Sequence, residues 1–167
     1  MPKLTRLIPT TLIPGGLTLF SSAIFLDSLR YKFTDHPNTQ TIFGKLDDWA
    51  TGLGAPGLFD HSGIFSQYVI GTAELVAVVL MVLGLFSALR RLGVLGNLLA
   101  LAVMTGAVSF HLFTPLGIDP NNDGGLLFVM AVLVWLSQIV MLYLRRDTLA
   151  ELLRRPLSVF KPAPTPV

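Results

Sequence analysis

The sequence predicts an all-α integral membrane protein, an antiparallel bundle of four transmembrane helices with an outer interfacial loop and helix. Two observations predict this fold. Hydrophobic residues make up 52% of the 167 residues and charged residues only 13%, whereas about a quarter of the residues of a soluble protein are charged. The apolar residues also gather in four long runs that few charges interrupt, and such runs leave no polar helix face for water.

Each of the four runs reaches the length of a membrane-spanning helix. Roughly 20 apolar residues cross the hydrocarbon, because each helical residue advances the chain by about 1.5 Å. The predicted spans cover residues 7–29, 67–89, 92–114 and 125–144. With their connections they form a predicted transmembrane domain of residues 1–146, in which small residues such as Gly96 and Ala100 mark faces where another helix can approach closely.

The basic residues predict the orientation of these spans. Nine of the twelve lysines and arginines fall before the first span, between the second and third, or after the fourth: Lys3, Arg6, Arg90, Arg91, Arg145, Arg146, Arg154, Arg155 and Lys161. Lysine and arginine are retained on the cytoplasmic side of a membrane. We therefore expect a multi-pass protein of the bacterial inner membrane with both termini in the cytoplasm.

The connection between the first two predicted spans, residues 31–66, is long enough to contain structure of its own. Its centre places Ile42, Phe43, Leu46 and Trp49 at helical spacing. This pattern predicts a short amphipathic helix on the outer membrane interface, which Pro37 is placed to begin. Such a helix either shields the bundle or gates a site within it.

Two shorter segments complete the predicted organisation. Residues 121–125 (NNDGG) are a turn that opens the fourth span, although they superficially resemble a calcium loop. Residues 147–167 form a basic, proline-rich cytoplasmic tail, whose first part, up to Arg155, fits an interfacial helix.

Ionisable residues inside the apolar runs are candidate site residues, because a charge in hydrocarbon needs a partner. Glu74 lies about two turns inside the second span, and His111 lies at the outer end of the third. Asp27 and Arg30 are three residues apart near the outer end of the first span, where they can pair. These side chains form either a proton-handling site near the outer face, for which histidine and a shifted carboxyl are suited, or merely structural ion pairs.

Several other kinds of chemistry find no support in the sequence. The chain has no cysteine, which excludes thiolate metal sites and thiol relays through its own side chains. It contains no nucleotide-binding or hydrolase motif, and its charge distribution does not indicate nucleic-acid binding. His36 and His61 with nearby aspartates are a weak metal pattern, and we expect no metal and no covalently bound cofactor.

Four segments resemble the DoxX family of small bacterial four-helix membrane proteins: 29–33 (LRYKF), 69–75 (VIGTAEL), 110–118 (FHLFTPLGI) and 123–125 (DGG). The resemblance covers about residues 7–146. It implies an outer polar pocket at Lys32, Glu74 and His111. The family is functionally mixed, and one branch is named for a subunit of thiosulfate:quinone oxidoreductase.

The resemblance and the polar residues together predict an accessory subunit of a membrane redox system, more readily than a stand-alone enzyme. Its pocket of Glu74, His111, Lys32, Arg30 and Asp27 would bind a quinone-like group or handle protons. The expected partners are the lipid bilayer and a membrane or peripheral redox protein, with the oligomeric state left open. A scaffold or assembly factor without ligand chemistry is the main alternative, and a small-molecule transporter is the weaker one.

Overall fold

The computed structural model describes residues 12–154 and contains no β-strand in that range. Its six α-helices and one 3-10 helix are α2 (Ile13–Lys32), α3 (Pro37–Gly52), α4 (Gln67–Leu83), η2 (Ser87–Leu89), α5 (Arg90–Phe113), α6 (Leu126–Leu144) and α7 (Arg146–Arg154). The all-α class is confirmed. The start of the first predicted span and the tail from residue 155 lie outside the described residues.

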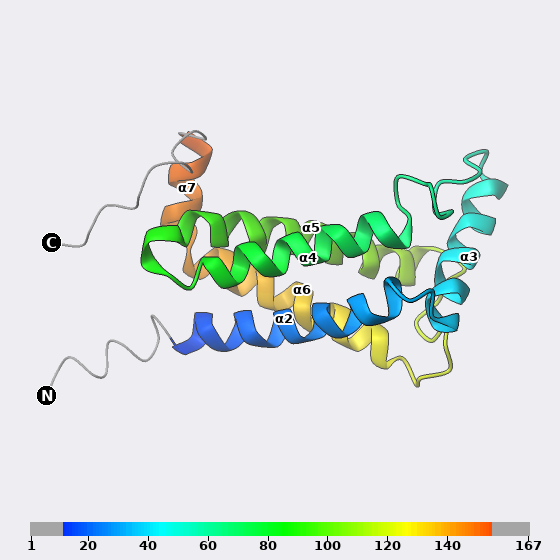
Figure 1. The fold of residues 1–167 in the computed structure, drawn as a ribbon, viewed down its shortest axis with the longest axis horizontal. Helices are drawn as coiled ribbons and strands as arrows, with labels where there is room; N and C mark the ends of the chain where they lie inside the picture. Colours follow the sequence, from blue (N-terminus) through cyan, green and yellow to red (C-terminus); the bar gives the residue numbers. More distant parts are fainter. Residues whose placement is uncertain (1–11, 155–167) are drawn as a thin grey trace, which may run out of the picture.

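Four helices, α2, α4, α5 and α6, run antiparallel to their neighbours and form a bundle, while the two shorter helices lie across its ends (Figure 1). Helix α3 crosses the end where α2 finishes and α4 begins. Helix α7 crosses the opposite end. Both ends of the bundle are therefore covered by a helix whose axis is turned away from the bundle axis.

The prediction of four transmembrane spans is wrong, because only two helices within residues 12–154 are long and apolar enough to cross a membrane. They are the continuous helix Ser87–Phe113, which contains α5, and Leu126–Leu144, which is α6. In α2, a Pro-Gly-Gly triplet, three serines and three charged residues lower the apolar content. Helix α4 has 17 residues, which advance the chain by only about 26 Å at the α-helical rise.

The second predicted span is too long because the chain turns earlier than the paired arginines suggested. Helix α4 ends at Leu83, and a short turn leads to Ser87, where the next helix begins. Arg90 and Arg91 are thus in the first turn of α5 and do not form the loop itself. The physical reason is the close contact of Gly84 with Gly93, which fixes the hairpin at the glycines.

Other elements confirm the sequence prediction. Helix α3 begins at Pro37, where the sequence placed its start, and its side chains Leu46 and Ala50 are buried against Phe59 and Leu116. The 121–125 segment is a turn: Asp123 accepts hydrogen bonds from the backbone N–H groups of Gly125, at 2.9 Å, and Leu127, at 3.1 Å. A carboxylate in this position satisfies N–H groups that the first turn of α6 leaves unpaired.

The bundle core is apolar at its centre and polar on both sides of that centre. Buried side chains from all four helices make up the central cluster: Phe25, Ala77, Val78, Met81, Ala100, Met104, Ala131 and Val134. Buried polar groups flank it, among them Ser21, Glu74, Asn97 and Gln138. The interior of this bundle is consequently less uniformly apolar than the core of a soluble helical protein.

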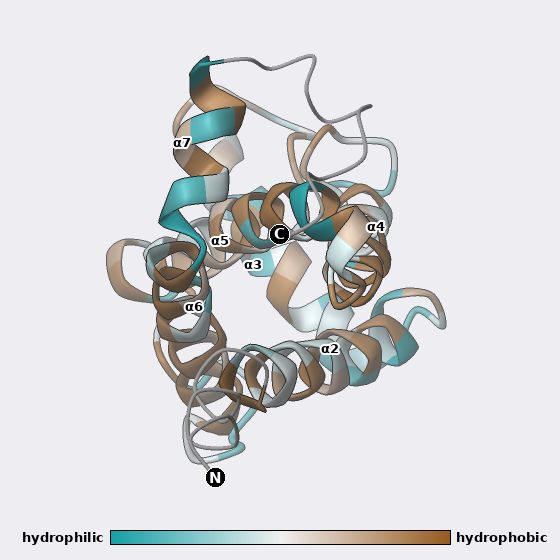
Figure 2. Cartoon of the chain, turned by 90° about the vertical axis from the view of Figure 1, so that its left-hand side faces the viewer, coloured by the Kyte–Doolittle hydropathy of each residue, from teal (hydrophilic) through white to brown (hydrophobic). Residues whose placement is uncertain are grey.

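The outer faces of the bundle are strongly apolar (Figure 2). On α4 the exposed residues include Val69, Leu75, Val76, Val79 and Val82, and on α6 they include Val129, Leu133, Leu136, Ile139 and Val140. A soluble bundle normally places charged and polar residues on these outer faces. A continuous apolar exterior is typical of a surface that contacts lipid or another protein.

Helices α4 and α5 are in contact through glycine backbones. A Cβ atom at Gly96 would lie 2.7 Å from the backbone nitrogen of Met81 and 2.9 Å from the carbonyl oxygen of Ala77. Neither backbone atom can move without displacing α4. Gly106, two to three turns further along α5, has its nearest neighbour at 3.9 Å from the same ideal position.

These contacts predict opposite effects for two identical substitutions on α5. Gly96→Ala should lower the free energy of unfolding by about 1–3 kcal/mol, because the added methyl group overpacks the interface with α4. Gly106→Ala is the matched control and should be neutral or stabilising by up to about 1 kcal/mol, because alanine favours the helix. Thermal unfolding of both variants in one detergent, followed by circular dichroism, measures the difference; equal melting temperatures would contradict the close packing at Gly96.

Candidate functional site

A buried ion pair joins α2 to α4 near the end of the bundle that α3 covers. The Nζ atom of Lys32 lies 3.1 Å from Oε1 of Glu74 and also donates a hydrogen bond to the Ser28 hydroxyl. The Glu74 side chain is 2% exposed and that of Lys32 is 14% exposed. The structure therefore brings together two of the five residues that the sequence proposed for a polar pocket.

Local sequence explains how this pair forms. Lys32 lies in the last turn of α2, where a positive charge interacts favourably with the helix dipole. Glu74 lies seven residues into α4, on the side that faces the bundle core. Gly71, one turn before Glu74, lies against the end of α2: a Cβ there would be 3.3 Å from Cζ of Phe33 and, at ordinary van der Waals distance, 3.5 Å from Cδ of Lys32.

One oxygen of Glu74 has no hydrogen-bond partner within residues 12–154. Lys32 uses Oε1, whereas Oε2 is buried and unpaired. Almost all buried polar atoms in folded proteins have a partner, so an unpaired carboxylate oxygen needs an explanation. It is the atom of this ion pair that remains available to a proton or to a hydrogen-bond donor on a ligand.

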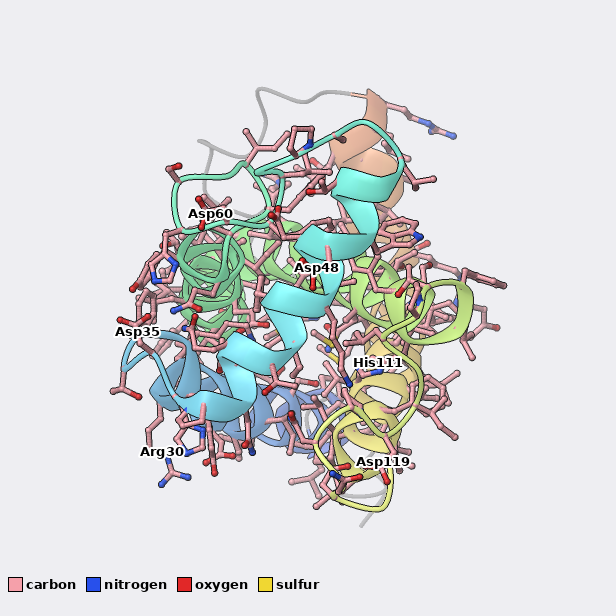
Figure 3. All side chains as sticks on the ribbon, turned by 90° about the vertical axis from the view of Figure 1, so that its right-hand side faces the viewer. Arg30, Asp35, Asp48, Asp60, His111 and Asp119 are labelled. Atoms are coloured by element: carbon pink, nitrogen blue, oxygen red, sulfur yellow. The ribbon has the colours of Figure 1, made fainter. Side chains whose placement is uncertain are left out.

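His111 is buried at the same end of the bundle but does not join the ion pair. Its Nδ1 atom donates a hydrogen bond to the carbonyl oxygen of Gly117 at 2.6 Å, and its ring meets the ring of Phe128 edge-on with centroids 5.5 Å apart. Figure 3, which looks onto this end of the bundle, shows His111 to one side of α3. Among the described residues no hydrogen bond connects it to Glu74 or Lys32.

The Gly117 contact fixes the role of the His111 ring. A carbonyl oxygen only accepts hydrogen bonds, so Nδ1 carries the proton and Nε2 of the neutral ring is left as an acceptor. His111 can accept a proton or a hydrogen bond through Nε2 alone. The structure therefore separates the predicted polar pocket into the Lys32–Glu74 ion pair and a separate histidine, His111.

Asp27 and Arg30 form an ion pair of their own on the outside of α2. The two side chains are 2.9 Å apart, with 62% and 68% of their side-chain surfaces exposed, respectively. The Arg30 guanidinium lies over the Tyr31 ring at 5.0 Å, and Figure 3 shows it at the periphery of the molecule. The structure does not bring these two residues to Glu74 or His111.

A polar network that the sequence analysis missed ties α2, α3 and α4 together. Gln67 is 2% exposed; its amide nitrogen donates to Asp35 at 2.5 Å and to the Lys32 carbonyl oxygen at 2.8 Å. Asp35 also accepts a hydrogen bond from the Tyr68 hydroxyl at 2.7 Å, and the side-chain amide of Gln40 in α3 donates to the side-chain oxygen of Gln67, Oε1, at 2.8 Å. The one feature of the sequence that could have predicted this network is the polar glutamine at the first position of an apolar run.

Asp35 has an unusual backbone and an altered acidity. Its φ of 51° lies in the left-handed region, which aspartate tolerates better than most residues. The Tyr68 hydroxyl, with help from Gln67 and nearby His61, holds the pKa of Asp35 below its ordinary value against the opposing effect of desolvation. The ionised form of Asp35 is therefore the form that this junction favours.

A small cavity of about 170 Å³ lies between α3 and the loop that follows it. Its lining residues are Gln40, Phe43, Gly44, Asp47, Asp48, Phe59, Asp60, His61 and Gln67. The Asp47 carboxylate accepts a hydrogen bond from the backbone N–H of Phe59 at 3.0 Å. His36, at the start of α3, accepts a hydrogen bond from the backbone N–H of Asn38. Within the described residues no three potential ligands come close enough to hold a metal ion.

Comparison of the chain with family models, with curated proteins and with solved structures finds no match.

Removal of the basic residue should destabilise the protein by different amounts in the two ion pairs of α2. Lys32→Met should lower the free energy of unfolding by about 3–5 kcal/mol, because it leaves the buried Glu74 carboxylate without a partner. Arg30→Ala, only two residues away, should cost no more than about 1 kcal/mol because its pair is exposed. Chemical denaturation of both variants tests this difference. A second change, Lys32→Met with Glu74→Gln, should recover much of the loss.

The Asp35 junction predicts a specific pH dependence. Because the pKa of Asp35 is lowered in the folded protein, its stabilising contribution is complete above the unfolded-state pKa, near 4, and is lost as the pH falls through the folded-state pKa. Asp35→Asn should flatten the fall in melting temperature between about pH 5 and pH 3. Asp27→Asn is the control, and an unchanged pH profile in Asp35→Asn would contradict the assignment.

Proposed function

We propose that this chain is a DoxX-like accessory subunit of a membrane redox system that binds a quinone-like head group beside Glu74. The observation that carries the proposal is the buried Lys32–Glu74 pair with its unpaired Glu74 oxygen, at one end of a bundle whose outer faces are apolar. The resemblance of the 29–33, 69–75 and 110–118 segments to that family supports it.

The distribution of polarity supports a location in the bacterial inner membrane. Helices α5 and α6 are long and apolar enough to cross the bilayer, and the apolar outer faces of α4 and α6 suit a lipid environment. Arg90 and Arg91 begin α5, and Arg145 and Arg146 follow α6 at the same end. On the positive-inside rule this end, together with both termini, faces the cytoplasm.

The Lys32–Glu74 pair has the groups that binding and protonation of a quinone require. The lysine ammonium can donate a hydrogen bond to a quinone carbonyl, and the free carboxyl oxygen can accept a proton and pass it on. Reduction of a quinone to a hydroquinone takes up two electrons and two protons. In this proposal the electrons come from the redox centre of a partner protein, and the protons enter through Glu74 from water.

Titration of the purified chain with a water-soluble short-chain quinone tests the proposal. Glu74→Gln should weaken binding about 10- to 100-fold, because one hydrogen bond to a charged group contributes roughly 1.5–3 kcal/mol and 1.4 kcal/mol is a factor of ten. Asp27→Asn, which alters an exposed carboxylate, should bind as the unchanged chain does. Equal affinity in Glu74→Gln and in His111→Ala would remove both residues from the proposal.

The same ion pair favours a second candidate, a scaffold or assembly factor without ligand chemistry. Lys32 already satisfies one Glu74 oxygen and joins α2 to α4, which is sufficient reason for a purely structural pair. On that account Glu74→Gln lowers the yield of folded protein, while the folded fraction keeps full function with its redox partner. The quinone titration with folded Glu74→Gln protein therefore separates the two candidates.

A further inference from the structure

A second set of buried polar groups lies in the bundle, away from the Lys32–Glu74 pair. It comprises Thr18, Ser21 and Ser22 of α2, Asn97 of α5 and Gln138 of α6, which are all between 0% and 5% exposed. The amide nitrogen of Gln138 donates to the Ser21 hydroxyl at 2.8 Å, so α2 and α6 are joined at this level. We refer to these five residues as the Asn97 layer.

The helical repeat places four of the five residues at one level, and Thr18 lies one turn further towards the α7 end. Ser21 and Ser22 precede Phe25 by about one turn, Asn97 precedes Ala100 by about one turn, and Gln138 follows Val134 by one turn. Phe25, Ala100 and Val134 pack together in the central cluster. Because α6 runs opposite to α2 and α5 (Figure 1), each of these steps leads towards the α7 end.

The Asn97 layer contains more hydrogen-bonding capacity than its own members use. Five side-chain atoms are buried and have no partner within residues 12–154: Thr18 Oγ1, Ser22 Oγ, both amide atoms of Asn97, and Gln138 Oε1. Buried polar atoms in folded proteins are normally hydrogen-bonded, so five unpaired atoms on α2, α5 and α6 require an explanation. None of the five residues carries a formal charge.

We propose that the Asn97 layer is a buried binding site for an uncharged group that donates and accepts hydrogen bonds. Hydroxyls and amides offer both donors and acceptors without attracting an ion, which fits water or the hydroxyl or carbonyl group of a small lipid-soluble molecule. Helices α2, α5 and α6 each supply at least one unpaired atom, so the bound group bridges all three. This inference does not depend on the proposed role of Glu74.

A crystal structure of the full chain grown from a lipid phase, at a resolution that shows water, tests the site directly. The expected result is non-protein density within hydrogen-bonding distance of the Asn97 amide. An isolated spherical peak identifies water, and an extended one identifies an organic molecule. A layer without such density, in which the five atoms bond to one another or to the backbone, overturns the proposal.

Stability measurements supply a second test that needs no crystal. Thr18→Val and Ser22→Ala are small changes, and each combined with Asn97→Leu forms a double-mutant cycle. If the residues share a bound group, Asn97→Leu lowers the melting temperature by several degrees, and the second substitution then has less effect than it has alone. A higher melting temperature in Asn97→Leu, or strictly additive shifts, overturns the proposal. Met104→Leu, a volume-conserving change in the apolar cluster of α5, is the control.

Addition of the short-chain quinone distinguishes the two sources of the bound group. A rise in melting temperature that is present in Glu74→Gln but lost in Asn97→Leu assigns an organic head group to the layer. An unchanged melting temperature in all three proteins, together with an isolated peak in the crystal, assigns water. Loss of quinone binding in Glu74→Gln alone contradicts neither result, because that substitution tests only the ion pair at the other end of the bundle.

Discussion

The structure depends on one constraint: polar groups inside the bundle must find their partners inside it, because the outer faces of the bundle are apolar. Glu74 meets Lys32 at 3.1 Å, and Gln138 meets Ser21 at 2.8 Å. Each contact joins two helices, so satisfying a polar atom also fixes how the helices pack. The unpaired atoms of Glu74 and of the Asn97 layer are among the buried polar atoms that find no hydrogen-bond partner in the part of the chain that the structure describes.

The two helices that lie across the bundle have related physical roles. Helix α3 buries Leu46 and Ala50 over the end that contains His111, and the Asp35–Gln67 network holds its first turn to α2 and α4. Helix α7 is held at the other end by the Arg91–Glu151 ion pair and by Leu152, which packs with Val94. The polar groups of the bundle interior therefore lie between α3 at one end and α7 at the other.

The two interior polar regions differ in the chemistry that they offer. The Lys32–Glu74 pair combines a cation with a carboxylate and can respond to protons. The Asn97 layer has only hydroxyls and amides, and an apolar cluster that includes Phe25 and Val134 lies between them. A group bound at one region would be bound independently of a group at the other, which is why separate substitutions can test them.

The sequence by itself determined the all-helical class, the positions of α3 and α6 and the placement of Glu74 within an apolar helix, since these follow from local hydrophobic spacing, turn residues and a lone carboxylate in an apolar run. Only the tertiary structure decided that Lys32 is the partner of Glu74, that Asp27 and Arg30 face outwards, and that His111 binds the Gly117 carbonyl. It also corrected the number of helices that are long and apolar enough to cross a membrane, because α2 contains polar residues and the Gly84–Gly93 contact sets where α4 stops. Hydropathy reports how apolar a segment is, whereas the end of a helix and the direction of a side chain depend on neighbours that are distant in the sequence.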